Sequence, residues 1–186
     1  MEKFLQRVQA SYNYSDYEIK LIRYFFLTMA SEISKLIIIF TFFGCIGRFS
    51  ESLLCTAALL ILRMSGGGFH CEHYITCLLT SFLFVSSSVF LAEIILPPQT
   101  MIFAGMIFCI ITAYKMVPVV SHHRPKPSQQ LIKQSRTINF IFLLICLFAV
   151  TLFHTNHYML IIFWLCMLHT VCLLYTSPSP RDSTSS

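Results

Sequence analysis

The chain has 186 residues, of which 56% are hydrophobic and only 11% are charged, and its formal net charge is +5. Soluble domains carry roughly 25% charged residues, so this composition excludes an ordinary soluble enzyme. A membrane span takes about 20 apolar residues, and the chain is long enough for several spans in one membrane domain. We therefore expect an all-α, polytopic integral membrane protein embedded in a lipid bilayer, with no nucleic-acid partner.

The first 35 residues mix charged and apolar side chains, which excludes the uninterrupted apolar stretch of a cleavable signal peptide. Apolar residues recur there at helical spacing, for example Leu5 and Val8, and then Ile19, Ile22 and Phe26. This pattern predicts an amphipathic N-terminal helix, or two, at the membrane interface.

Six apolar runs follow this region. They cover residues 33–46, 52–64, 74–96, 101–120, 137–153 and 158–174. The last four are long enough to cross a bilayer, whereas the first two are short and must tilt, thin the bilayer or re-enter. Glu32 and Lys35, three residues apart, are expected to pair on a helix. We predict four to six transmembrane helices.

The connections between the runs predict the orientation. Segment 121–136 has four basic residues and no acidic one, whereas 97–100 and 154–157 have no Lys or Arg. The basic residues are Arg124, Lys126, Lys133 and Arg136. The positive-inside rule puts 121–136 in the cytoplasm, and tracing back puts the segment before residue 74 and the N-terminus there as well.

Segment 63–77 (RMSGGGFHCEHYITC) places polar chemistry between two apolar runs, where ionisable groups suggest a functional site. Cysteine is a nucleophile as its thiolate, and a neighbouring histidine can take its proton. For Cys77 the candidate bases are His70 and His73. On an unbroken helix His73 is an i, i+4 neighbour, whereas His70 lies about 10 Å along the axis. A direct contact between His70 and Cys77 requires the helix to begin after His70.

Glycines make such a break plausible. Gly66, Gly67 and Gly68 permit a loop with close backbone approach and disfavour a continuous helix. Free amides at the start of the next helix can receive an oxyanion or a substrate carboxylate. Arg63 is a candidate partner for that carboxylate, with snorkelling to the membrane edge as the alternative.

A zinc site is chemically compatible with His70, His73 and Cys77, which share a helical face beside Cys71. However, the sequence has no H-E-x-x-H motif and no second ligand pair apart from the two adjacent histidines at 122–123. Purely structural histidines are a further alternative. We predict no metal and no other cofactor.

The other six cysteines lie in or beside apolar runs and are expected to pack as small hydrophobic residues. They are Cys45, Cys55, Cys109, Cys146, Cys166 and Cys172.

The pattern Arg63, Gly67, Gly68 and His70, followed by Cys77, resembles the signature of the accessory gene regulator B (AgrB) family, membrane cysteine endopeptidases of Gram-positive quorum sensing. Length, the amphipathic N-terminus and the position of the motif before a long span also fit this family.

The basic segment resembles the family's Pro…Asn-Lys-Pro region more loosely, through Pro118 and the sequence His-Arg-Pro at 123–125. The chain departs from the family pattern at Cys71, where a small residue usually follows the histidine. That difference leaves a second thiol beside the site.

The resemblance implies cleavage of an AgrD-type precursor peptide near its C-terminal side. Cys77 would attack the scissile carbonyl to form an acyl-enzyme, and His70 would act as general base and then acid. A thiol or hydroxyl of the bound peptide would then close a thiolactone or lactone ring. Arg124 and Lys126 in the basic segment would attract the precursor's acidic tail. The resemblance also suggests a homodimer.

Two other functions are kept as alternatives. A non-enzymatic peptide transporter or exporter would use the same basic segment and tolerate loss of the thiol. A metal-dependent membrane hydrolase would be sensitive to a chelator.

The last residues, 172–186, differ from the rest. Residues 172–182 (CLLYTSPSPRD) match codon by codon the translation of a transposase adapter used in sequencing libraries. We therefore expect an AgrB-like peptidase domain at 1–171 and an adapter-derived or disordered tail at 172–186.

Overall fold

The computed structural model describes residues 15–66, 74–117 and 129–176, and every secondary-structure element in these ranges is an α-helix. The helices are α2 (Asp16–Cys45), α3 (Phe49–Gly66), α4 (Tyr74–Ile94), α5 (Gln99–Met116), α6 (Gln129–Leu152) and α7 (His157–Thr176). The chain forms two compact units, Met1–Ile46 and Gly47–Ser186. The predicted all-α class is confirmed.

Helix α2 begins with a capping box at Ser15 and Glu18. The backbone N–H of Ser15 donates to Glu18 Oε2 at 2.8 Å, and the Glu18 N–H donates to Ser15 Oγ at 3.3 Å. This reciprocal pair satisfies helix N–H groups that otherwise lack an intrahelical partner. The hydrogen bonds from Ser15 also lower the pKa of Glu18.

The first apolar run is longer than its sequence pattern indicated. Helix α2 contains a 21-residue segment, Phe25–Cys45, that is long and apolar enough to cross a membrane. Glu32 and Lys35 interrupt the apolar pattern, but they pair at 2.5 Å on one side of the helix, as predicted. The prediction that the first run is too short to cross without tilting, thinning the bilayer or re-entering is therefore wrong. The predicted interfacial residues Ile19 and Ile22 belong to this same continuous helix.

Five helices of the described chain are long and apolar enough to span a bilayer: α2, α4, α5, α6 and α7. This number lies within the predicted four to six. Helix α3 is not among them. The protein is a multi-pass membrane protein.

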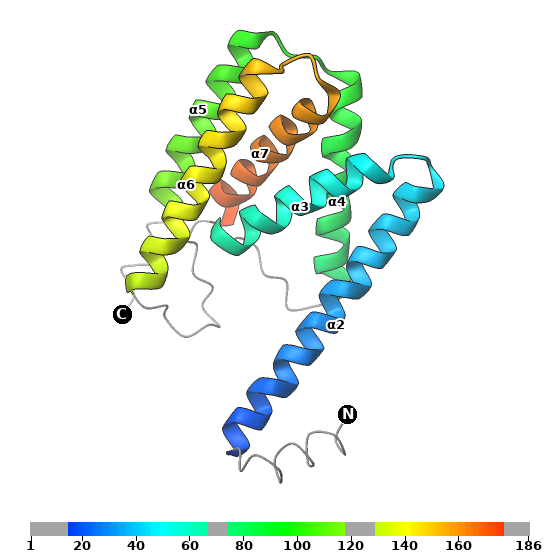
Figure 1. Cartoon of the computed structure of the whole chain (residues 1–186), viewed down its shortest axis with the longest axis vertical. Helices are drawn as coiled ribbons and strands as arrows, with labels where there is room; N and C mark the ends of the chain where they lie inside the picture. The colour runs from blue at the N-terminus through cyan, green and yellow to red at the C-terminus, as the bar shows by residue number, and fades with distance from the viewer. Residues whose placement is uncertain (1–14, 67–73, 118–128, 177–186) are drawn as a thin grey trace. The chain divides into compact units, whose positions relative to one another are not determined.

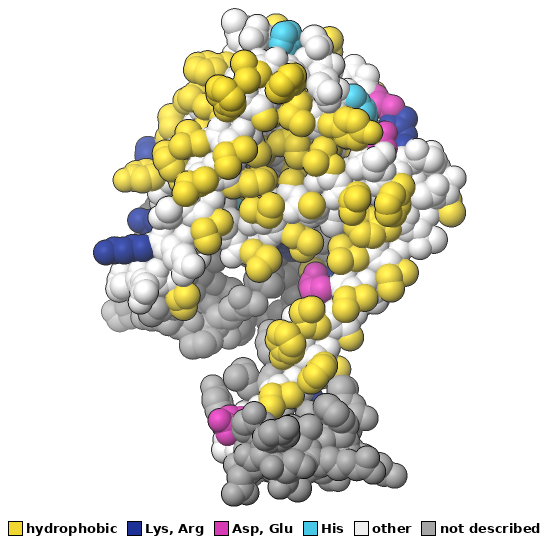
Figure 2. Space-filling model, viewed as in Figure 1, with side chains coloured by type: hydrophobic (Ala, Val, Ile, Leu, Met, Phe, Trp, Pro, Cys, Tyr) yellow, Lys and Arg dark blue, Asp and Glu magenta, His cyan; other side chains and the backbone are white. Residues whose placement is uncertain are grey.

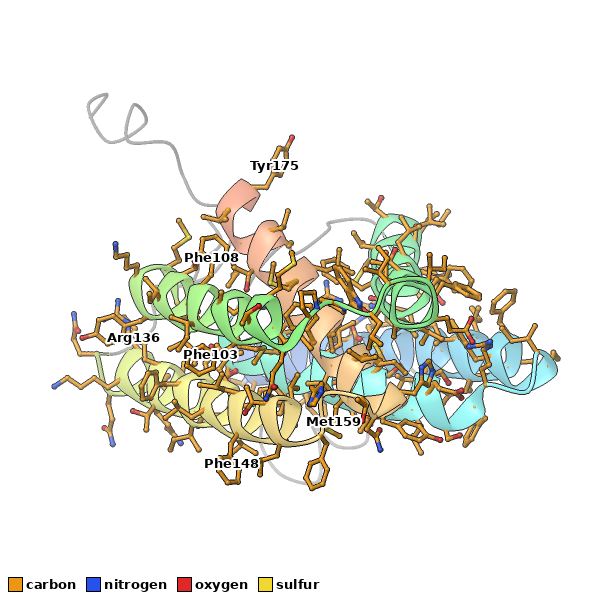
Figure 3. All side chains as sticks on the ribbon, turned by 90° about the horizontal axis from the view of Figure 1, so that it is seen from above. Phe103, Phe108, Arg136, Phe148, Met159 and Tyr175 are labelled. Carbon is orange, nitrogen blue, oxygen red and sulfur yellow. The ribbon has the colours of Figure 1, made fainter. Side chains whose placement is uncertain are left out.

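Helix α7 forms the centre of the second unit. It packs against α3, α4, α5 and α6, and Figure 1 shows it between the α5–α6 pair and α4. Half of its span is buried, whereas the spans of α4, α5 and α6 are only 22–28% buried. The other helices turn apolar side chains outward, as Figure 2 shows over the bundle, and Phe148 and Tyr175 point away from it in Figure 3.

Helices α5 and α7 approach each other closely at Gly105. A Cβ atom added at Gly105 would lie 3.0 Å from Cε2 of Phe163 and 3.2 Å from Sδ of Met167. The absence of a side chain at this position therefore allows the contact.

Helices α4 to α7 alternate in direction. Short connections at 95–98 and 153–156 join α4 to α5 and α6 to α7. The Arg136 Nε group donates to the Val117 carbonyl at 2.6 Å, which joins the end of α5 to the start of α6. The starts of α4 and α6 therefore lie at the same end of the bundle as the ends of α5 and α7.

Helix α3 begins at the opposite end. Glu51 lies 3.9 Å from His157 Nε2 at the start of α7, and Arg48 pairs with Glu93 at the end of α4. Helix α3 then runs back, and its last turn bonds to Ser81, seven residues into α4, and to Asn139, ten residues into α6. We call the end of the bundle that holds the end of α3 and the start of α4 the Cys77 end.

The predicted tail is only partly described. Residues 172–176 form the last turn of α7, and 177–186 lie outside the described residues. The predicted domain boundary at residue 171 and the predicted origin of the tail stay predictions.

Candidate active site

Cys77 lies in the first turn of α4, on the helix face that packs into the bundle. This face repeats every three to four residues, through Cys77, Ser81, Val85, Ser88 and Ala92. Residues at this spacing share one side of an α-helix. The side chain of Cys77 is consequently buried, with 9% relative exposure.

Arg63, in the last turn of α3, reaches the same face of α4. Its Nη1 donates to Ser81 Oγ at 2.9 Å, and Ser81 Oγ donates to the Cys77 carbonyl at 2.9 Å. The guanidinium is therefore within one helical turn of Cys77 and bonds to a neighbouring helix. This contact differs from the snorkelling geometry considered as its alternative.

The end of α3 is also joined to α6. Nδ2 of Asn139 donates to Ser65 Oγ at 3.0 Å, and Ser65 Oγ donates to the Ile61 carbonyl at 2.7 Å. Both Asn139 and Ser65 are buried. This bond fixes α3 two residues beyond Arg63 and so restrains the position of the guanidinium.

A second ionisable group is buried near Arg63. His169 of α7 is 5% exposed, and its Nε2 has no hydrogen-bond partner among the residues that the structure describes. Arg63 lies within electrostatic range of His169.

Neither His169 nor Asn139 was among the predicted site residues. For His169 a signal was available, since an ionisable residue inside an apolar run is a functional candidate by default. Asn139 gave no comparable signal, because its partner on α3 is distant in sequence.

The remaining predicted site residues lie outside the described part of the chain. Segment 67–73 contains Gly67, Gly68, His70 and His73, together with Cys71, and segment 118–128 contains Arg124 and Lys126. The choice between His70 and His73 as base therefore stays open. Both segments connect helix ends that lie at the Cys77 end.

The seven cysteines in ranges 15–66, 74–117 and 129–176 form no disulfide bonds. The thiols of Cys55, Cys109, Cys146 and Cys166 are buried, which confirms their predicted role in packing. Cys45 is exposed and Cys172 is half-buried. Within the same ranges no three His, Cys, Asp or Glu side chains are grouped to hold a metal ion.

Comparisons with known proteins agree with the family resemblance noted in the sequence. Residues 1–173 match the model of the family described as accessory gene regulator B. The chain is also similar to an AgrB-like protein of Clostridium perfringens (strain 13 / Type A), with 24% identity over 118 residues. That alignment covers 63% of this chain and 63% of the relative's length. No solved structure matches the chain. Because the family model covers nearly the whole sequence, the chain belongs to the accessory gene regulator B family, whose members take part in peptide quorum sensing.

Proposed function

We propose that this protein is a membrane cysteine endopeptidase that cleaves an AgrD-type precursor and promotes closure of the released peptide into a thiolactone or lactone. The observation that carries the proposal is the position of Cys77. Its side chain faces into the bundle in the first turn of α4, and a guanidinium is fixed one turn farther along. Membership of the accessory gene regulator B family supports the same proposed function.

The chemistry has two transfers. The Cys77 thiolate attacks the scissile carbonyl, the C–N bond breaks, and the amine leaves with a proton that His70 supplies. The N-terminal fragment stays on Cys77 as a thioester. A thiol or hydroxyl of that fragment then attacks the thioester and displaces the Cys77 thiolate, which closes the ring.

Burial of Cys77 favours ring closure over hydrolysis. Exchange between thioesters is nearly balanced in free energy, so the ring forms only where water is kept from the acyl-enzyme. The site around Cys77 is suited to this, because its neighbours one and two turns along α4 are buried as well. Arg63 at the end of α3 is a source of positive charge for a substrate carboxylate or oxyanion.

We further propose that the Cys77 end faces the cytoplasm. Lys115 near the end of α5, and Lys133 and Arg136 in the first turns of α6, belong to this end. At the opposite end, acidic side chains accompany the basic ones. Glu93 pairs with Arg48, and Glu51 lies beside His157. This difference follows the positive-inside rule and makes the site accessible to a ribosomally made precursor.

The test is co-expression with an AgrD-type precursor, followed by mass spectrometry of the peptide products. Cys77→Ala and His70→Ala should each abolish cleavage, whereas Cys71→Ala and His73→Ala should not. Cys45→Ala is the matched control, because this thiol is exposed on α2.

Two outcomes would change the proposal. Loss of cleavage in His73→Ala alone would assign the base to the i, i+4 neighbour of Cys77. Processed peptide from every variant would exclude the endopeptidase and leave a peptide carrier as the function.

A further inference from the structure

His169 is the buried histidine of the described chain. His154 and His157 are half-buried and lie at the end of the bundle opposite to Cys77, whereas His169 is 5% exposed within the central helix. Helix α7, which carries His169, packs against α3, α4, α5 and α6.

The imidazole is incompletely satisfied in this environment. Its Nε2 has no hydrogen-bond partner among residues 15–66, 74–117 and 129–176. Buried polar atoms are almost always paired, because leaving one unpaired costs its full desolvation free energy. In a membrane bundle an unpaired ionisable group indicates a functional role.

The position of His169 along α7 matches that of the Cys77 site. His169 precedes the end of α7 by seven residues, and Ser81 follows the start of α4 by seven residues. At ~1.5 Å per residue, each lies about 10 Å from the Cys77 end. Helices α4 and α7 pack against each other in opposite directions, so the two residues lie at the same depth.

Arg63 connects the two positions. Its guanidinium donates to Ser81 and lies within electrostatic range of His169. A fixed cation at this point disfavours a cationic ligand and favours an oxygen acceptor. A neutral imidazole with a proton on Nε2 donates a hydrogen bond to such an acceptor.

We propose that His169 is a substrate-binding residue, whose Nε2 donates to a backbone carbonyl oxygen of the precursor peptide beside Arg63 and one helical turn from Cys77. This inference rests on the proposed function, since it names a further contact of the same site. The ligand class is the backbone of a polypeptide that enters at the Cys77 end.

The experiment measures precursor binding and cleavage with the full-length protein in lipid nanodiscs. A synthetic precursor carrying a fluorophore is titrated against Cys77→Ala protein, with and without His169→Leu, and cleavage rates are measured with Cys77 intact. Loss of one hydrogen bond should weaken binding about tenfold. His169→Gln, which keeps an N–H donor, should restore part of the affinity. Thr56→Val is the matched control, because it removes another buried polar atom, a hydroxyl that has no partner among the described residues, at nearly constant volume two turns from Arg63.

The thermal unfolding temperature distinguishes a substrate-binding role of His169 from a role in packing. If His169 binds substrate, His169→Leu should unfold at the wild-type temperature or above it, since it removes an unpaired polar atom. Wild-type affinity in His169→Leu would overturn the inference, and so would a lowered unfolding temperature that His169→Gln shares. If Cys77→Ala protein still cleaves the precursor, the proposed function fails instead, independently of the result at His169.

Discussion

Substitutions at the two ends of the Ser65–Asn139 hydrogen bond are expected to have unequal effects on stability. Asn139 is 1% exposed, and its Nδ2 donates to Ser65 Oγ at 3.0 Å. Ser65→Ala removes the acceptor and leaves a buried amide without a partner. We expect this change to lower the free energy of unfolding by about 1–3 kcal/mol.

Asn139→Leu removes the amide itself and keeps a similar volume. Ser65 Oγ still donates to the Ile61 carbonyl, so no orphaned hydroxyl results. The substitution also removes Asn139 Oδ1, which has no hydrogen-bond partner among the described residues. A hydrogen bond between membrane helices contributes about 0.6 kcal/mol on average, and removing the unpaired oxygen offsets this loss. We expect the free energy of unfolding of Asn139→Leu to lie within about 1 kcal/mol of the wild-type value.

The assay is equilibrium unfolding in mixed micelles with increasing denaturing detergent, followed by helical circular dichroism. Ser52→Ala is the control, because this buried hydroxyl donates to the Phe49 carbonyl within its own helix. Its removal leaves no donor unpaired. The reasoning is refuted if Ser65→Ala has wild-type stability while Asn139→Leu is strongly destabilised.

Three further predictions concern other parts of the chain. Gly105→Ala should lower the free energy of unfolding by about 1–3 kcal/mol in the same assay, because its methyl group would press on α7; wild-type stability would contradict this close contact. Ser15→Ala should speed amide hydrogen exchange in the first turn of α2 at neutral pH. Since hydrogen bonding depresses the pKa of Glu18 in the folded protein, the cap is present at neutral pH and lost as pH falls through that pKa, so wild type and variant should converge in acid. Glu93→Gln removes the charge that pairs with Arg48, an exposed pair expected to contribute less than about 1 kcal/mol, and precursor cleavage should stay at the wild-type rate.

Much of the fold could be predicted from hydrophobic run lengths. The third run was predicted to begin at residue 74, where α4 begins. The length of the first run was underestimated, because Glu32 and Lys35 interrupt the apolar pattern of a helix that is long enough to span a membrane. A salt bridge between residues one turn apart neutralises both charges locally, and run length alone does not take account of it.

The candidate site was only partly predictable. The spacing of residues in segment 63–77 singled out Cys77 and Arg63, because the chemistry of that segment is local in sequence. The contact of Arg63 with Ser81 and its proximity to His169 depend on how α3 packs against α4 and α7. Such contacts leave no periodic signal in any one helix.

The central position of α7 has a consequence for biosynthesis. Helices α3 to α6 precede α7 in the chain, yet each of them packs against it. During synthesis their inward faces, including the one that carries Cys77, therefore lack their common partner until residues 157–176 have been inserted into the membrane. A ribosome that stalls before this point would leave these four helices in the bilayer without a closed core, and the Cys77 thiol without its buried surroundings.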